Sequence, residues 1–515
     1  TMISLVVATE PSHHDTDLVA VKNVIFMIGD GMGPQQVGLL NSYAKYAPNS
    51  IYKANGRTTA IEQVMAAGVL GYAYHEAANV LVVDSAASAT QFATGVHAGS
   101  EMIGCDQFGN AAKTILEIAK QKGKSTGLVS DTRITHATPA AFAAHQTHRS
   151  KENAIAIDLL HNEVNVMLSG GLRHWLPQKA NDKSSVLHQQ LKTRTGGRID
   201  IISKRKDNRN LLAEAEKKQY TLVFTKSQLE QAEGTKLLGL FSASGMPNGI
   251  QETATKNDPN RTIPTLKEMT IKALEILSQN DKGFFLMVEG GQIDWTGHDN
   301  DTGTMLHEML KFDETIGYVY EWIKNRNDTL LIISADHETG GFGFSYSRRD
   351  VPEPKDLPGK LFKGEKFHPN FNFGNYATLD KLYHQKLSYP EIMKVFDALP
   401  QRQQTPEFLA NIVNMSTQFP ITQTEATIIL EIEENDYYVA GHEYLGTKIF
   451  PKIHDFKEFY VYNDDGRHDL LARVVGKYQN TVWATGTHTS TPVPVIAYGP
   501  KKVIAQFSKM MHTTE

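Results

Sequence analysis

Hydrophobic and polar residues along the chain follow two patterns, one typical of buried strands and one of amphipathic helices. Short apolar, β-branched runs at 21–28, 284–288 and 329–334 predict strands buried on both faces. Longer segments at 265–279 and 304–325 carry apolar residues on one face and predict helices. Their alternation predicts an α/β protein with a large, mostly parallel central sheet and helices on both faces.

The rest of the first 350 residues continues this alternation. Further strands are predicted at 80–83, 126–129, 164–168, 220–225 and 237–241, and helices at 114–122, 140–148, 152–161, 211–218 and 227–233. The sheet pattern returns at 482–498.

Residues 347–435 break the alternation. The segment is rich in Lys, Pro, Phe and Asn and then becomes helical at 389–398, 406–414 and 424–433. We interpret it as an insertion within a single domain that spans residues 1–515, and we expect it to form an oligomer contact or a lid.

Composition excludes several classes of protein. No apolar run is long enough to span a bilayer, and a formal charge of −5 gives no electrostatic reason to bind nucleic acid. The single cysteine, Cys105, excludes an internal disulfide framework. A short apolar run at 3–8 is read either as the remnant of a signal sequence or as an edge strand.

Four chemically capable residues lie within two residues of the end of a predicted strand: Asp30, Ser85, Glu289 and Asp336. In parallel α/β sheets, ligands bind beyond the carboxyl ends of the strands. We therefore expect these four side chains to share one site.

Ser85 precedes a run of mostly small residues that predicts a closely packed helix. A serine at the start of a helix lies at the positive end of the helix dipole, where anions bind well. We interpret Ser85 as a nucleophile. No Gly-x-Ser-x-Gly motif surrounds it, but coordination to a metal ion can also activate a serine hydroxyl.

Candidate metal ligands follow the same strands. Asp294 and His298 are four residues apart and can chelate one ion if the segment is helical. Asp336 and His337 follow a strand, and His488 lies in a Thr/Gly-rich loop. This mixture of carboxylates and imidazoles suits Zn²⁺.

Binding of a harder metal ion, or of a phosphate group, would require side chains other than these. Asp30, Glu289 and the hydroxyl of Thr138 would suit Mg²⁺. The planar fork of Arg149 could hold two phosphoryl oxygens, although an isolated arginine is more often a surface residue.

The segments that carry these residues resemble alkaline phosphatases along nearly the whole chain. They are GDGMG at 29–33, DSAASAT at 84–90, HATPA at 136–140, VEG at 288–290, DWTGH at 294–298, ADH at 335–337 and GTHT at 486–489. Seven motifs in the same order make coincidence negligible.

The resemblance implies a phosphatase that hydrolyses a broad range of phosphate monoesters and releases inorganic phosphate. It implies two zinc ions and one magnesium ion, with Ser85 as the residue that becomes phosphoserine and Arg149 as the phosphate clamp. The implied ligands are Asp294, His298 and His488 for the first zinc, Asp30, Asp336, His337 and Ser85 for the second, and Asp30, Thr138 and Glu289 for magnesium.

Two positions differ from the best-known enterobacterial pattern. His136 stands where that pattern has aspartate, and Trp295 stands where it has lysine. The pair, like the large insertion, resembles the marine Vibrio-type branch. We expect both side chains beside the substrate, with His136 supporting magnesium through water.

Other functions remain open on the sequence. One alternative is another enzyme of the same superfamily: a phosphodiesterase, a mutase or a sulfatase. Diesterases of this type commonly lack the third metal site, and Ser85 lacks the Pro and Arg that follow a sulfatase nucleophile. A second alternative is a non-catalytic surface protein that binds metal or phosphate. The family resemblance implies a homodimer, either periplasmic or secreted.

Overall fold

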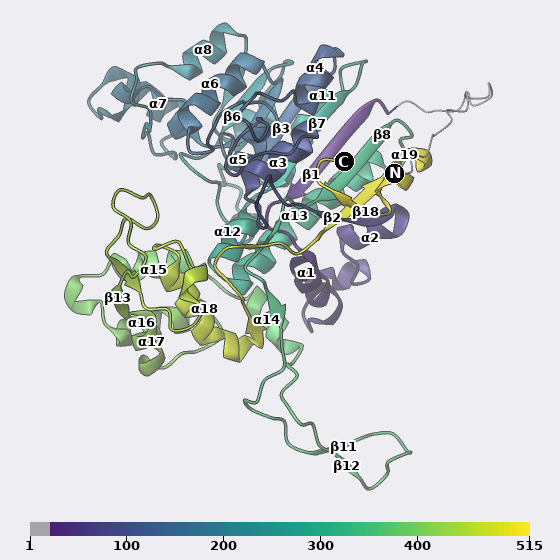
Figure 1. Ribbon diagram of the computed structural model, residues 1–515, viewed down its shortest axis with the longest axis vertical. Coiled ribbons are helices and arrows are strands. Elements are labelled where there is room, and N and C mark those ends of the chain that lie inside the picture. The colour runs from purple at the N-terminus through teal and green to yellow at the C-terminus, as the bar shows by residue number, and fades with distance from the viewer. Residues whose placement is uncertain (1–20) are drawn as a thin grey trace, which may run out of the picture.

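The computed structural model describes residues 21–515, so the predicted segment at 3–8 lies outside the described residues. A ten-stranded sheet forms the centre of the molecule, with the order β18-β2-β17-β8-β1-β7-β3-β4-β6-β5 (Figure 1). Every pair from β8 to β5 is parallel, whereas β17 runs antiparallel to both of its neighbours. The predicted fold class is confirmed.

The strands of this sheet are β1 (Asn23–Gly29), β2 (Val69–Tyr74), β3 (Ser125–Arg133), β4 (Val166–Gly170), β5 (Thr221–Val223), β6 (Leu237–Leu240), β7 (Phe284–Gly290), β8 (Thr329–Ser334), β17 (Val493–Tyr498) and β18 (Met510–His512). Short two-stranded pairs join β9 (Glu338–Thr339) to β16 (His488–Thr489), β10 (Gly343–Phe344) to β15 (Thr481–Val482), β11 (Lys355–Asp356) to β12 (Lys366–Phe367), and β13 (Ile432–Glu434) to β14 (Ile449–Pro451).

Helices cover both faces of the sheet because successive strand side chains point to opposite sides. In β1, Ile25 and Met27 join one hydrophobic cluster, while Phe26 and Ile28 join another. The first cluster packs under α1 (Pro34–Tyr46), α2 (Ala60–Ala67), α9 (Lys226–Gln231), α11 (Leu266–Leu277) and α13 (Thr302–Ile323). The second packs under α3 (Ser85–Thr94), α4 (Ile115–Gln121), α5 (Ala137–Ala141), α6 (Glu152–Asn162), α7 (Val186–Arg194) and α8 (Leu211–Lys217).

Three predicted elements differ from the structure. The helix predicted at 424–433 is shorter, because α17 (Gln423–Ile429) ends before β13 (Ile432–Glu434). Residues 80–83 form a loop, not a strand: the chain turns at Asn79, whose φ is +63°, and Leu81 is 81% exposed. The helix predicted at 140–148 is shorter, because α5 ends at Ala141 and the chain then pairs with another loop. Gln146 and Ile103 exchange both backbone hydrogen bonds at 2.9 Å, which a helix at that position could not allow.

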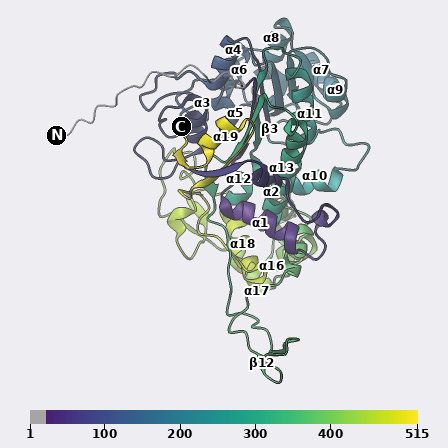
Figure 2. The ribbon, with the colours of Figure 1, turned by 90° about the vertical axis from the view of Figure 1, so that its right-hand side faces the viewer.

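Residues 345–480 contribute no strand to the ten-stranded sheet. They contain α14 (Ala377–Tyr383), α15 (Tyr389–Asp397), α16 (Pro406–Ser416), α17 (Gln423–Ile429) and α18 (Gly466–Gln479), and an arm carrying β11 and β12 that projects away from the body in both views (Figure 1 and Figure 2). The insertion limits of 347 and 435 remain a prediction, and α18 lies beyond them while packing against α15 and α17. Within 21–515, no helix combines the length and apolar character needed to cross a bilayer.

Two buried polar side chains of α13 connect the body to these helices. Asp301 caps α13 through the amide of Thr304 at 3.0 Å and also accepts hydrogen bonds from Tyr389 N at 2.8 Å and Gln385 Nε2 at 2.8 Å. His307 donates from Nε2 to the carbonyl of Tyr383 at 2.9 Å and stacks on the Tyr383 ring. The helical region is therefore joined to the sheet by specific hydrogen bonds as well as by apolar packing.

His307 should make stability depend on pH. Burial lowers its pKa from 6.5 to about 4, a difference worth about 3 kcal/mol. Between these values the unfolded state binds the extra proton, so this stability is complete above pH 6.5 and is lost as the pH falls toward 4. Measured by urea unfolding, the free energy of unfolding should fall between pH 7 and pH 4 by about 3 kcal/mol less in His307→Gln than in the wild type. The surface variant His161→Gln should show the same fall in unfolding free energy as the wild type. If His307→Gln also shows the full wild-type fall, the assignment to His307 is contradicted.

Candidate active site

The carboxyl ends of three adjacent central strands supply three of the predicted residues. Asp30 follows β1, Glu289 lies near the end of β7, and Asp336 follows β8. All three are 0% exposed. Ser85 reaches the same site from the start of α3, with a loop rather than a strand before it.

Ser85 is held in place by the capping of its helix. The Asp84 carboxylate accepts hydrogen bonds from the amides of Ala86 at 2.8 Å and Ala87 at 3.2 Å, and its other oxygen accepts one from Glu101 N at 2.7 Å. Asp84 thus fixes the turn, and its Oδ1 also lies 3.9 Å from Nη1 of Arg149. The Ser85 hydroxyl is left free to lie 3.1 Å from Nε2 of His337.

Asp294, His298 and His488 form the first group of possible metal ligands, with one ligand atom from each within 4.8 Å of the others. Helix α12 (Gln292–His298) places Asp294 and His298 on one face, and each histidine Nε2 lies 3.4 Å from Asp294 Oδ1. The pairing of β16 with β9 brings His488 beside Thr339.

Backbone carbonyls fix how the two imidazoles of this group are turned. His298 Nδ1 lies 2.7 Å from the carbonyl of Gly486, and His488 Nδ1 lies 2.8 Å from the carbonyl of Val83. A carbonyl can only accept, so both Nδ1 atoms carry a proton, and both Nε2 atoms lie on the side of Asp294, where each could ligate a metal ion.

The second group lies beside the first. Nε2 of His337 is 3.4 Å from Asp30 Oδ1 and 3.4 Å from Asp336 Oδ2. Asp294 also lies within 4.8 Å of the ligand atoms of Asp30 and His337. It is therefore positioned between the two groups.

The third group joins Asp30, His136 and Glu289, again within 4.8 Å. The hydroxyl of Thr138 lies buried at this group without a hydrogen-bond partner, and Ser130 and Thr132 donate to one oxygen of Glu289. The imidazole of His136 thus lies beside Asp30 and Glu289, and its support of magnesium through water stays a prediction.

The electrostatics of these groups require positive charge. Burial, and then the neighbouring carboxylates, hold the pKa of Asp30 well above its usual value; burial raises that of Glu289 to about 8 and that of Asp336 to about 6. Both oxygens of Asp30, Oδ2 of Asp336 and Oε1 of Glu289 are buried without a hydrogen-bond partner. Uncompensated buried carboxylates of this kind are costly, so the donor set fits divalent cations.

Ser85 and the first group open into a cavity of about 410 Å³ that Arg149, His136 and Trp295 also line. Nη2 of Arg149 lies 3.3 Å from Nε2 of His136, and the Trp295 ring meets that imidazole edge to face, with centroids 5.9 Å apart. Both expected substrate contacts therefore lie on one wall, beside the cation that could bind an anion.

Sequence reasoning missed several residues that line the cavity. Tyr462 packs edge to face against the imidazole of His298 with centroids 5.1 Å apart, and Tyr444 packs against Tyr462. Both come from the region after residue 435 and carry no motif, so only the folded arrangement reveals them.

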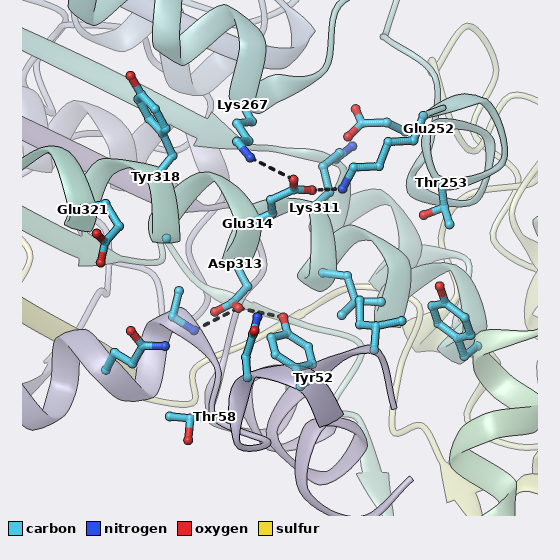
Figure 3. A pocket seen from close by; sticks show the side chains of 18 of the residues that line it. Tyr52, Thr58, Glu252, Thr253, Lys267, Lys311, Asp313, Glu314, Tyr318 and Glu321 are labelled. Carbon is cyan, nitrogen blue, oxygen red and sulfur yellow. Dashed lines mark hydrogen bonds and ion pairs between the residues drawn. The ribbon is translucent and has the colours of Figure 1, made fainter. Parts of the chain in front are cut away.

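A larger cavity, of about 820 Å³, lies away from these groups against α13 (Figure 3). Two of its carboxylates are already paired: Asp313 accepts from Tyr52 Oη at 2.7 Å and from two amides, and Glu314 binds Lys256 and Lys267. No metal-ligating group found in residues 21–515 includes a residue of its wall. Its size therefore does not make it the better candidate.

Comparisons with known proteins agree on one family. The family model described as alkaline phosphatase matches residues 21–427. Alkaline phosphatase 4 of Bacillus subtilis (strain 168) is 30% identical over 499 residues, covering 97% of this chain and 88% of that protein. The structure of Thermus thermophilus alkaline phosphatase superposes with a TM-score of 0.73 at 23% identity, covering 98% of this chain and 93% of that one. The cold-active alkaline phosphatase of the psychrophile Shewanella sp. superposes with a TM-score of 0.66 at 26% identity, covering 96% of this chain and 97% of that one.

Asp30→Asn should have opposite effects with and without metal. In protein stripped by a chelator, the substitution removes a buried charge that has no partner, so the melting temperature should rise by several degrees. In metal-loaded protein it removes a ligand, so the melting temperature should fall. The measurement is thermal unfolding of both forms at pH 8.

Asp313→Asn provides the matched control. Asp313 is equally buried, but it has three donors within the protein, so its substitution should destabilise both forms. A fall of the same size in both forms of Asp30→Asn would contradict a cation at that carboxylate.

Proposed function

Because the chain belongs to the alkaline phosphatase family and is therefore a phosphomonoesterase, we propose that Ser85 is its nucleophile and that three metal ions surround that serine. The observation that carries the proposal is the set of buried, unpartnered carboxylate oxygens that meet at the Ser85 end of the sheet. They leave a serine hydroxyl and an arginine facing one cavity.

Each step uses a group with a defined position. The guanidinium of Arg149 holds two oxygens of the phosphoryl group in a planar fork. The start of α3 adds the positive end of its dipole. Oγ of Ser85 then forms a bond to phosphorus while the bond to the leaving alkoxide breaks, which yields phosphoserine and an alcohol. Attack of water on phosphoserine from the vacated side releases inorganic phosphate and restores the serine.

The metal ions act through the three groups of side chains. Asp294, His298 and His488 would hold one zinc; Asp30, Asp336 and His337 would hold a second zinc beside Ser85; and Asp30, Thr138 and Glu289 would hold magnesium, with His136 supporting that ion through water. When bound, these cations lower the pKa of the serine hydroxyl and offset charge on the phosphoryl oxygens.

Ser85→Ala should lower turnover of an aryl phosphate monoester by roughly 10³-fold or more, because the covalent route is lost. Acid quenching of the wild type should trap phosphate on the peptide that contains Ser85, and the variant should show none. Thr94→Ala serves as control, since Thr94 lies at the far end of the same helix and its hydroxyl bonds only to the backbone there, to Thr90 O and Val96 N. Full turnover in Ser85→Ala would refute the covalent route, and a preference for an aryl diester would favour the phosphodiesterase alternative.

His136 and Trp295 support a finer assignment within the family, to the marine Vibrio-type branch. An aromatic ring at 295 adds no cation beside Arg149, and Arg133, whose guanidinium lies 5.9 Å from the centroid of that ring, is paired with Glu152. Product phosphate should therefore dissociate readily.

Trp295→Lys should tighten inhibition by inorganic phosphate, because the added ammonium approaches the bound anion. The inhibition constant measured at several salt concentrations checks this, since an electrostatic gain shrinks as salt rises. Trp295→Phe is the matched control, with the ring kept and no charge added. An inhibition constant in Trp295→Lys equal to that of the wild type would remove the explanation.

The remaining assignments extend the family resemblance. A homodimer is supported by the projecting arm, where Leu361 and Phe362 are 85% and 56% exposed. A periplasmic or secreted location suits a chain with one cysteine and a requirement for zinc. Phosphate monoesters of varied leaving groups fit a cavity that is closed around the phosphoryl position by charged residues and bordered by two tyrosines.

A further inference from the structure

A fourth group of metal-ligating side chains lies next to the first and has no part in the chemistry above. It consists of Asp299, Asp465 and His468, and one ligand atom from each lies within 4.8 Å of the others. Asp299 ends α12 directly after His298, and the other two lie at the start of α18. The group therefore bridges the sheet body and the helical region.

Its geometry is compact and largely closed to solvent. Nδ1 of His468 lies 2.7 Å from Oδ1 of Asp299 and 3.9 Å from Oδ1 of Asp465. The side chains of His468, Asp299 and Asp465 are 11%, 13% and 29% exposed. An ordinary surface cluster would leave these groups in water.

Asp469 supplies an independent observation. It follows Asp465 by four residues on α18 and so lies on the same helix face. It is 1% exposed, and its Oδ1 is buried without a hydrogen-bond partner. Its buried carboxylate therefore lies one helical turn from Asp465 and beside His468, with no donor from the protein to its Oδ1.

The nearby arginines make their hydrogen bonds and ion pairs with other groups. Arg473 lies over the ring of Tyr460 at 4.6 Å and donates to the carbonyl of Asp455, while Arg467 pairs with Asp397. The imidazole of His468 can carry at most one positive charge against three carboxylates. Burial of the remaining negative charge is unfavourable unless a cation is present.

We propose that Asp299, Asp465, His468 and Asp469 bind a divalent cation that is separate from the ions of the active site. Carboxylate oxygens with one imidazole nitrogen suit Mn²⁺ or Zn²⁺. Asp465 also lines the 410 Å³ cavity, which gives the ion a path from solvent. The bound ion joins the end of α12 to the start of α18 and so fixes the wall from which Tyr462 reaches His298.

Anomalous scattering from crystals of the metal-loaded enzyme, collected on both sides of the zinc and manganese edges, tests the site directly. A peak between Asp299 and His468 is expected, separate from any peak at Ser85, and the edge at which it appears identifies the ion. Density there that shows only hydrogen-bonded water, with no anomalous signal at either edge, would overturn the proposal. The position of the peak keeps this result independent of whether the active-site assignments hold.

Metal content after exhaustive dialysis gives a second measurement. Asp469→Asn and His468→Gln should each contain one ion per chain fewer than the wild type. Asp464→Asn should keep the wild-type content, because Asp464 is exposed and belongs to no metal-ligating group found in the described chain. Equal content in all four proteins counts against the site, and if a variant does not fold, the crystallographic result alone decides.

Discussion

Negative charge that the protein itself cannot neutralise is the constraint on which this structure depends. Asp30, Asp336 and Glu289 stand at the ends of adjacent strands with buried oxygens that no donor reaches. Parallel strands force these positions together, because their carboxyl ends meet at one edge of the sheet. On the proposed assignment, bound cations complete the fold, and the same cations prepare the serine for attack. Stability and catalysis draw on one set of interactions.

The surroundings of the site are rigid because almost every other polar group there has a partner. The carboxylate of Asp84 accepts hydrogen bonds from three amides, and the two imidazoles near Asp294 are each held by a backbone carbonyl. The contrast between these satisfied groups and the few unsatisfied oxygens marks the positions that we propose for the ions. The same contrast at Asp469 extends the argument to a place that the phosphatase chemistry does not require.

Sequence patterns predicted the parts of the molecule that local physics determines. The β-branched runs gave β1, β7 and β8, and the motifs gave the residues at their ends. The run at 80–83 misled because apolar character alone does not show whether a strand has a neighbour to pair with; Leu81 faces solvent instead. The placement of His136 and the contacts of Tyr462 depend on segments that are distant in sequence. The group around His468 was missed for the same reason, since its acids belong to separate helices and match no spacing motif.

The carbonyl of Val83 has a consequence for how this segment can change in evolution. It orients His488 across the site, while the residues before it expose their side chains to water. Positions 80–82 are thus free to vary in chemical character, because their side chains touch little of the site. The length of the loop is not free, since adding or deleting one residue would move that carbonyl and turn the imidazole away. We expect related chains to differ in the residue types of this loop and to have the same loop length.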